Sequence, residues 1–281
     1  MIAFNGQYLD EASHGNMRIT DACLGGQWVI GGKNWLVAAT QQAIIAAFGA
    51  EEGIAVIRRT NDYLNALALT DQTRAQQLAM FINEDPLLVT SLVETSKTRW
   101  LVGDGVSYIN TGFIPNTNSS VECEYQVITH SGGANAILGC RNVRGIDEFM
   151  IWIYNDYITR GWGATGQPTV AIGVNVSLPH EIGMGNGWFL YDGIRSTQPS
   201  GAFTGAIPCY LFCCNTLGEP DSQRSKKAQI SYAIFGGDTQ AHFIPHLRPN
   251  GEAGMLDIIS GTFHPNANTA GAFTIAITDK Q

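Results

Sequence analysis

The chain has 281 residues, enough for one large domain or two ordinary ones with a substantial hydrophobic core. It carries 24 acidic and 16 basic residues, for a formal net charge of −8, without clusters of lysine or arginine. Binding to a nucleic acid backbone is driven by clustered cationic side chains, so we expect no nucleic acid partner. Charged residues are only 14% of the chain and glycine contributes 32 residues, which is typical of a β-rich protein with many tight turns.

The first 32 residues alternate short apolar pieces with glycine and asparagine, which indicates short strands or an extended arm. The chain does not open with a basic stretch followed by an apolar run, and no window approaches the roughly 18 apolar residues of a membrane span. We therefore expect no secretion signal, no membrane insertion and folding in a cytosol. In that compartment the cysteines are expected to be buried free thiols. They are Cys23, Cys123, Cys140, Cys209, Cys213 and Cys214.

Between residues 34 and 96 the apolar residues recur at helical spacing. Gly49 and Gly53 favour several short helices over one long helix. Asp71 is a candidate N-cap, and Asp85 followed by Pro86 is typical of another helix start. Residues 1–97 are therefore predicted to form a small mixed domain that is largely helical.

From Arg99 onward the pattern changes to that of strands. Residues 121–127 alternate apolar side chains with Glu122, Glu124 and Gln126, as expected for a strand with one wet face. Further short strands are predicted at 149–154, 169–176, 188–191, 207–214, 229–235 and 274–277. Many short strands separated by turn residues predict an antiparallel β-sandwich over residues 98–281.

Two stretches carry a more specific signal. One is WLVGDGVSYINTGFIP at residues 100–115, and the other extends from the FIP motif at 243–245 through GMLD at 254–257 and SGTF at 260–263 to GAF at 271–273. Together they resemble the opening and closing strands of a concanavalin A-like (laminin G-like) jelly-roll domain found in tail and other surface proteins of phages of gut Bacteroidales. The resemblance implies an antiparallel jelly-roll sandwich in a virion protein, made in the host cytoplasm and displayed on the assembled particle. It also implies other virion proteins, including further copies of this chain, as partners.

Catalytic patterns are weak in this sequence. Retaining glycosidases need two carboxyl groups about 5–5.5 Å apart, and jelly-roll glucanases carry them in a Glu-x-Asp-x-x-Glu array that does not occur here. Glu122 and Glu124 are instead interpreted as solvent-facing residues of one strand. His242 and His246 would be about 13 Å apart on a strand, too far to share a metal ion. We therefore expect no enzymatic activity and no cofactor.

The remaining chemistry is that of a binding surface. Sugars are held by aromatic faces with amide and carboxylate groups around them, and the predicted ligand-binding residues combine these groups. They are Asn142, Asp156, Tyr157, Arg160 and Trp162. Trp162 is expected to be exposed because its neighbours Gly161 and Gly163 cannot shield an indole, whereas Trp152 and Trp188 also fit core positions. A calcium ion at Asp156 or Asp192 is left open, since the sequence offers no dense loop of oxygen ligands.

These expectations combine into a virion structural protein, a tail or particle-surface component. Residues 1–97 would attach it to the particle or to a partner subunit, and residues 98–281 would form a lectin-like domain that binds host surface polysaccharide. Two alternatives remain: a decoration or assembly subunit of head or tail without a glycan ligand, and a glycan-cleaving enzyme on a jelly-roll fold.

Overall fold

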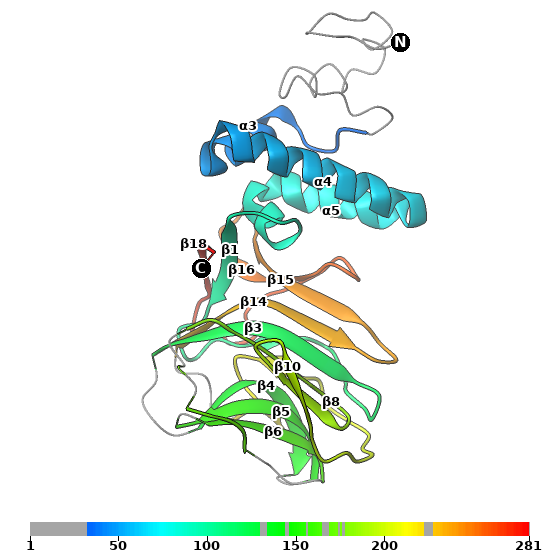
Figure 1. Cartoon of the computed structure of the whole chain (residues 1–281), viewed down its shortest axis with the longest axis vertical. Helices are drawn as coiled ribbons and strands as arrows, with labels where there is room; N and C mark the ends of the chain where they lie inside the picture. The colour runs from blue at the N-terminus through cyan, green and yellow to red at the C-terminus, as the bar shows by residue number, and fades with distance from the viewer. Residues whose placement is uncertain are drawn as a thin grey trace, which may run out of the picture. The chain divides into compact units, whose positions relative to one another are not determined.

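The computed structural model describes residues 33–129, 134–143, 146–155, 157–164, 169–173, 175, 178–221 and 227–280 (Figure 1). The chain divides into two compact units. The helical unit extends to Thr98 and includes the residues from Asp279 onward, and the β unit is Arg99–Thr278. The expected mainly β chain, with large antiparallel sheets after a small helical region, is confirmed. Among the described residues, no helix is both long and apolar enough to cross a membrane.

The described residues of the helical unit form three α-helices and a 3-10 helix, namely α3 (Ala38–Phe48), α4 (Ala50–Thr70), α5 (Gln72–Glu84) and η1 (Pro86–Ser91). The side chain of Asp71 caps α5 by accepting a hydrogen bond from the N–H of Arg74 at 2.9 Å, as predicted. Gly49 separates α3 from α4 with a φ of 83°. Gly53 lets the two helices approach closely, because a Cβ there would lie 2.7 Å from the Cα of Ile45.

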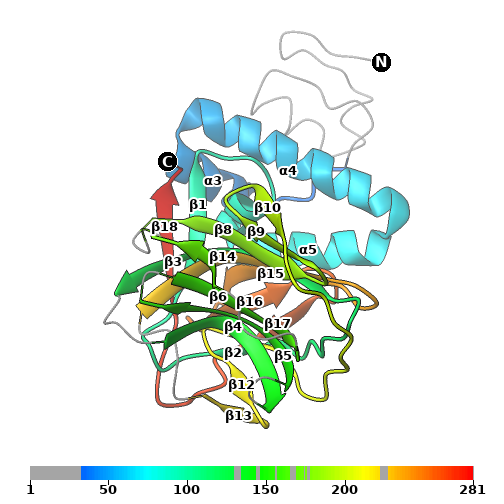
Figure 2. The same ribbon diagram turned by 60° about the horizontal axis from the view of Figure 1, so that its bottom comes forward.

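The described residues of the β unit form two sheets, which lie as separate layers in Figures 1 and 2. The ten-stranded sheet has the order β10-β9-β8-β3-β14-β15-β16-β17, with β1 paired to β14 and β18 paired to β1. Its strands are β1 (Lys97–Val102), β3 (Ser120–Thr129), β8 (His180–Gly185), β9 (Trp188–Tyr191), β10 (Ile194–Thr197), β14 (Lys227–Gly236), β15 (Ala241–Leu247), β16 (Ala253–Asp257), β17 (Thr262–His264) and β18 (Thr274–Asp279).

The eight-stranded sheet has the order β13-β12-β4-β5-β6-β7, with β11 paired to both β4 and β2. Its strands are β2 (Ile109–Asn110), β4 (Ala134–Val143), β5 (Ile146–Tyr154), β6 (Tyr157–Gly163), β7 (Thr169–Ile172), β11 (Tyr210–Leu211), β12 (Asn215–Thr216) and β13 (Glu219–Pro220). The strand expected over 207–214 is interrupted, because Phe212 adopts a φ of 65° and the chain turns back along β4.

One hydrophobic core joins the two sheets. Alternate residues of β3, such as Val121, Cys123 and Tyr125, pack in the same cluster as Phe149 and Ile151 of β5. This alternation is the predicted pattern of a strand with one buried face. The prediction of buried free thiols is confirmed for Cys123, Cys140, Cys209, Cys213 and Cys214, whereas Cys23 lies outside the described residues.

The two stretches that carry the sequence resemblance meet in the β unit. Asp104 accepts hydrogen bonds from the N–H groups of Val106 at 3.0 Å and Ser107 at 2.8 Å, and from that of Ala272 at 2.9 Å. Burial alone would raise the pKa of Asp104, but these hydrogen bonds outweigh it and lower the pKa to about 2. Asn266 adds a second link by accepting from the N–H of Tyr108 at 3.2 Å. These hydrogen bonds therefore join the beginning of the β unit to its end.

Candidate functional site

Trp162 lies in the core, and the expectation of an exposed indole is wrong. Its side chain on β6 is 0% exposed, packs edge-on against Phe203, and donates from Nε1 to the carbonyl of Gly201 at 2.9 Å. Gly161 allows a neighbouring strand to approach, since a Cβ there would lie 2.6 Å from Oε2 of Glu148, and Gly163 adopts a positive φ of 51°. Glycine at position 161 therefore makes room for a buried carboxylate of β5 and does not uncover the indole.

Arg160 is also buried, at 1% exposure, so its predicted contact with a surface ligand is contradicted. Its guanidinium donates to the carbonyl of Trp188 at 3.0 Å and to that of Pro199 at 2.6 Å. Burial lowers its pKa to about 10, which leaves the group charged at neutral pH. Arg160 and Trp162 thus both hold the segment 199–201 from within the sandwich.

Asn142 and Tyr157 lie at opposite ends of the eight-stranded sheet. The register pairs Ala134 of β4 with Tyr154 of β5, and Tyr154 with Tyr157 of β6. Asn142 is half-buried and follows Ala134 by eight residues on β4, a separation of about 27 Å along a strand. Asp156 lies outside the described residues. The structure therefore does not bring the five predicted residues together.

The structure does bring Tyr157 and Tyr154 together. Tyr154 was predicted to lie on a strand but was not among the predicted ligand-binding residues. They pair directly across the β5–β6 hairpin, where Cβ atoms are about 4.5–5.5 Å apart, and they share one face of the sheet. Tyr154 is 53% exposed and Tyr157 is 42% exposed. Among the large hydrophobic side chains that are exposed in the described residues, these two are the aromatic ones. We call Tyr154 and Tyr157 the tyrosine pair.

The tyrosine pair continues a row of side chains on the outer face of β5. Phe149, Ile151 and Ile153 point into the core, so Met150, Trp152 and Tyr154 share the opposite face. Trp152 is buried there in a small second cluster with Ala136, Met150 and Cys214. The indole therefore supports the sheet beside the tyrosine pair and is not itself an open platform.

Carboxylates gather on the outer face of the ten-stranded sheet. Glu124 of β3 lies directly opposite Glu181 of β8, a pairing that no local sequence pattern predicts because the two residues are far apart in the chain. Ser231 donates to Glu124, and the hydroxyl of Tyr232 donates to Glu181 at 3.0 Å. Burial, reinforced by Glu181, raises the pKa of the Tyr232 hydroxyl. Both acids thus accept hydrogen bonds from residues of β14.

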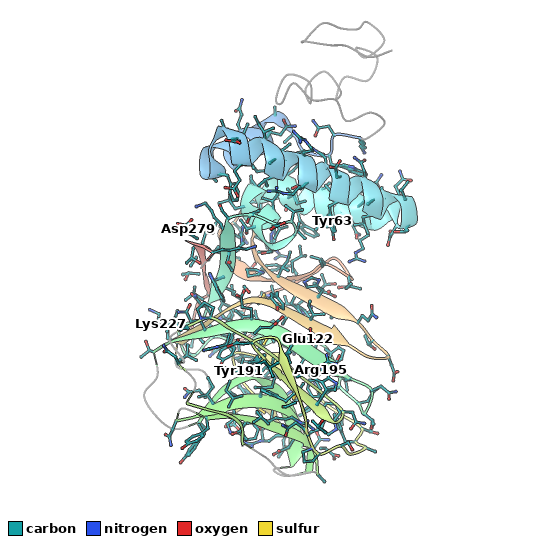
Figure 3. All side chains as sticks on the ribbon, viewed as in Figure 1. Tyr63, Glu122, Tyr191, Arg195, Lys227 and Asp279 are labelled. Atoms are coloured by element: carbon teal, nitrogen blue, oxygen red, sulfur yellow. The ribbon has the colours of Figure 1, made fainter. Side chains whose placement is uncertain are left out.

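Glu122 belongs to the same face and lies near Arg195 of β10, with 3.5 Å between Oε1 and Nη2 (Figure 3). The guanidinium of Arg195 also stacks over the indole of Trp188 at 4.0 Å from the ring centroid. This ion pair is open to solvent and contributes little to stability.

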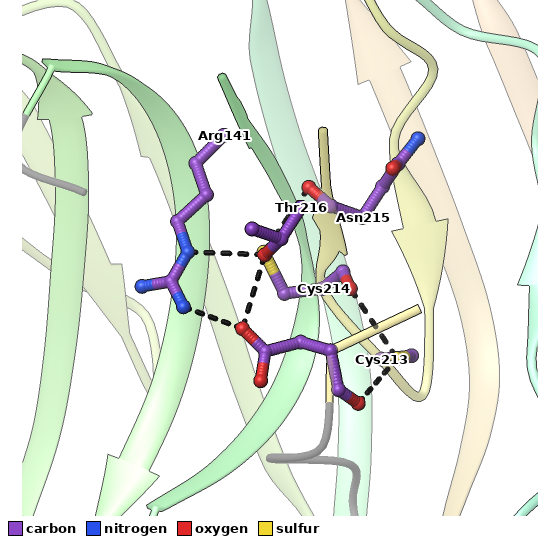
Figure 4. A network of polar contacts seen from close by, with 6 residues as sticks. Arg141, Cys213, Cys214, Asn215 and Thr216 are labelled. Atoms are coloured by element: carbon purple, nitrogen blue, oxygen red, sulfur yellow. Dashed lines mark hydrogen bonds and ion pairs between the residues drawn. The ribbon is translucent and has the colours of Figure 1, made fainter. Parts of the chain in front are cut away.

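A polar network around Arg141 lies at the end of the eight-stranded sheet away from the tyrosine pair (Figure 4). Arg141 donates from Nε to Oγ1 of Thr216 at 3.1 Å and forms an ion pair with Asp221. Thr216 donates to the same carboxylate at 3.0 Å. Both charged side chains are largely buried, so the network fastens the β12–β13 hairpin to β4. Arg141 is accordingly a structural residue in this fold.

Metal ligation has little support in the part of the chain that the structure describes. No group of three or more His, Cys, Asp or Glu side chains there is arranged to hold an ion. Asp192 receives the N–H of Glu181 at 3.0 Å on one oxygen and contacts Nδ1 of His180 at 2.8 Å with the other. His242 and His246 lie on strand β15, as predicted.

Comparison with known proteins adds no family to this description. No protein-family model matches the chain, and no curated protein matches it significantly.

Proposed function

We propose that the chain is a virion structural protein, a tail or particle-surface component, whose β unit is a lectin-like jelly roll that attaches the particle to a host surface glycan. The contact is assigned to the tyrosine pair, which is the observation that carries the proposal. The sequence resemblance supplies the virion context, and the two packed antiparallel sheets are compatible with a jelly roll.

The chemistry of the tyrosine pair suits a sugar ring. A phenol offers an apolar face to the C–H groups of the sugar and a hydroxyl that can donate or accept at its edge. The two tyrosines are paired across a hairpin, and each is more than 40% exposed, so both are open to a ligand. Tyrosine also loses little conformational entropy when it is immobilised, which favours it at binding surfaces.

The test compares adsorption of purified protein variants to host cells and to isolated capsular polysaccharide. The double variant Tyr154→Ala/Tyr157→Ala is expected to bind at least about tenfold more weakly, because both stacking faces are removed. Leu217→Ala serves as the control, since Leu217 is a large apolar side chain that is 70% exposed but lies at the β12–β13 turn. Unchanged adsorption of the double variant would reject this site.

A second proposal is a decoration or assembly subunit without a glycan ligand. The burial of Trp162 and Arg160 favours it, because it removes the strongest predicted sugar-stacking group from the surface. Wild-type protein that incorporates into particles but adsorbs to no host polysaccharide would support this function over attachment.

The glycan-cleaving alternative depends on Glu124 and Glu181, which are directly opposed as an acid pair would be. Release of reducing sugars from host polysaccharide by the wild-type protein, lost in Glu124→Gln and Glu181→Gln, would establish it. Tyr154→Ala/Tyr157→Ala would leave the chemical step intact in that case.

A further inference from the structure

The β9–β10 hairpin turns through Asp192 and Gly193, whose φ angles are 46° and 77°. Positive φ at both central residues is the geometry of a type I′ turn, for which Asp-Gly is a preferred pair. Two hydrogen bonds fasten this turn to β8. The N–H of Asp192 donates to the carbonyl of Glu181 at 2.8 Å, and Oδ1 of Asp192 accepts from the N–H of Glu181 at 3.0 Å. The second oxygen of Asp192 then reaches the first residue of β8, which is His180.

The imidazole of His180 is enclosed, with 6% of the residue exposed, and both ring nitrogens have partners. Nε2 lies 2.8 Å from the carbonyl oxygen of Asn175. A carbonyl can only accept, so Nε2 must carry a proton. Nδ1 lies 2.8 Å from Oδ2 of Asp192 and 3.0 Å from the hydroxyl of Tyr191, which is 3.5 Å from Nε2. Nδ1 therefore faces both a carboxylate, which only accepts when it is ionised, and a hydroxyl, which can also donate.

These two partners suit different charge states of the ring. In the imidazolium, Nδ1 carries a proton and donates to the carboxylate of Asp192. In the neutral ring that keeps its proton on Nε2, Nδ1 offers a lone pair, which can accept from the hydroxyl of Tyr191 but repels a carboxylate oxygen 2.8 Å away. Loss of one proton thus exchanges the partner of Nδ1 and weakens its hold on the turn. Histidine is the side chain that ordinarily makes this change between pH 5 and 8.

Two tyrosines face the ring and keep their protons over this range. Tyr125 of β3 and Tyr191 of β9 lie with their ring centroids 6.1 Å and 5.1 Å from the imidazole. Burial, together with the charge of Asp192, raises the pKa of Tyr191 to about 12, and burial raises the pKa of Tyr125. Tyr191 is therefore available as a donor at pH 8. Glu181 points away from the imidazole, to the outer face of the sheet, where it accepts from Tyr232.

We propose that His180 is a pH-sensitive switch that fastens the β9–β10 hairpin when it is protonated and releases it when it is neutral, as Nδ1 passes from Asp192 to Tyr191. β10 ends the order of the ten-stranded sheet and pairs with β9, so the ladder holds the hairpin from one side. The switch therefore acts on an edge of the described sheet and leaves the core between the two sheets in place. The proposal is independent of the tyrosine pair.

The first experiment reads the protonation of the ring in the full wild-type chain, so it does not depend on how well a variant folds. Nitrogen NMR shifts of the His180 ring are measured at pH 5.5 and pH 8. Both nitrogens are expected to carry protons at pH 5.5, and Nε2 alone at pH 8. His264 is an internal control with the opposite neutral form, because its Nδ1 lies 2.9 Å from the carbonyl of Asn110 and should keep the proton. A neutral His180 ring with its proton on Nδ1, or the same protonation at both pH values, overturns the proposal.

The second experiment measures hydrogen exchange at the N–H groups of Glu181 and Asp192, corrected for the intrinsic rate at each pH. In the wild type their protection is expected to be at least about threefold lower at pH 8 than at pH 5.5, because the turn is released. Asp192→Asn should show no such difference, since its side-chain oxygen still accepts from Glu181 and asparagine tolerates the positive φ, but the charge is gone. Asp238→Asn is the matched control and should keep the difference, because Asp238 is an exposed aspartate that accepts from Asn116 and Asn118. A difference that persists in Asp192→Asn, or that is absent from the wild type, overturns the proposal.

Discussion

The two units are stabilised in contrasting ways. In the helical unit, side-chain amides hold the irregular segment 33–37 through individual hydrogen bonds, and each bond can be removed by changing one residue. In the β unit, backbone ladders of two sheets enclose one continuous apolar core that includes Trp162 and Phe149. A defect in the first unit should therefore remain local, whereas a core defect in the second should affect the whole sandwich.

The largest expected effect tests the core of the β unit. Trp162→Ala should reduce the free energy of unfolding by about 3–5 kcal/mol, because it leaves a cavity between the sheets. Tyr157→Ala, on the same strand but exposed, should change it by less than about 0.5 kcal/mol. Urea unfolding followed by tryptophan fluorescence and circular dichroism measures both. Equal effects of the two substitutions would contradict the burial assigned to β6.

The next effect should be confined to the helical unit. Asn61→Ala leaves the N–H of Trp35 without its buried acceptor, which costs about 1–3 kcal/mol. Thermal unfolding followed by dichroism at helical wavelengths should shift downward, while the β transition stays in place. Asn250→Ala is a surface control with little expected effect. A single transition that moves as a whole would mean that the two units do not unfold separately.

A smaller effect depends on pH through Asp104. Its pKa is lowered from 3.8 to about 2 in the folded chain, so the ionised form contributes stability that is complete above pH 4 and is lost as the pH falls toward 2. After solvent screening of this exposed residue, the contribution is about 1 kcal/mol. Unfolding measured between pH 2 and 5 should be flatter for Asp104→Asn than for the wild type. Parallel pH profiles would count against the hydrogen bonds to Asp104.

The smallest expected effect is that of reductant. Burial raises the pKa of the Cys123, Cys209 and Cys214 thiols, so they react slowly in the folded protein. Alkylation after denaturation should find six free thiols by mass spectrometry, and the melting temperature should be the same with and without reductant. A defined disulfide in freshly purified protein would contradict folding in a reducing compartment.

The sequence predicted elements better than it predicted surfaces. Helical spacing in 34–96 and alternation around β3 are local patterns, and both appear in the structure. The error at Trp162 came from reading its glycines as a sign of exposure. The two-residue period shared with Ile158, a core residue, places Trp162 on the buried face and was the more informative signal.

Tyr154 could have been found in the same way. Only two positions of the sequence separate Tyr154 from Tyr157, and a hairpin with so short a connection pairs the residues on either side of it. Asn155 has the positive φ, 52°, that this turn requires. Two other contacts join residues far apart in the chain, and no local pattern encodes them. They are the pairing of Glu124 with Glu181 and the hydrogen bond from the N–H of Val37 to Asn83.

The link from Asp104 to Ala272 has a consequence for biosynthesis. One of its partners is among the first residues of the β unit to leave the ribosome and the other is among the last, 168 positions later. Strands β1 and β18 are joined across a similar interval. The helices can pack while translation continues, but the sandwich cannot close until the chain is nearly complete. Its unpaired strand edges stay exposed until then. Premature termination shortly before Ala272 would thus release a folded helical unit attached to an aggregation-prone, unclosed sheet.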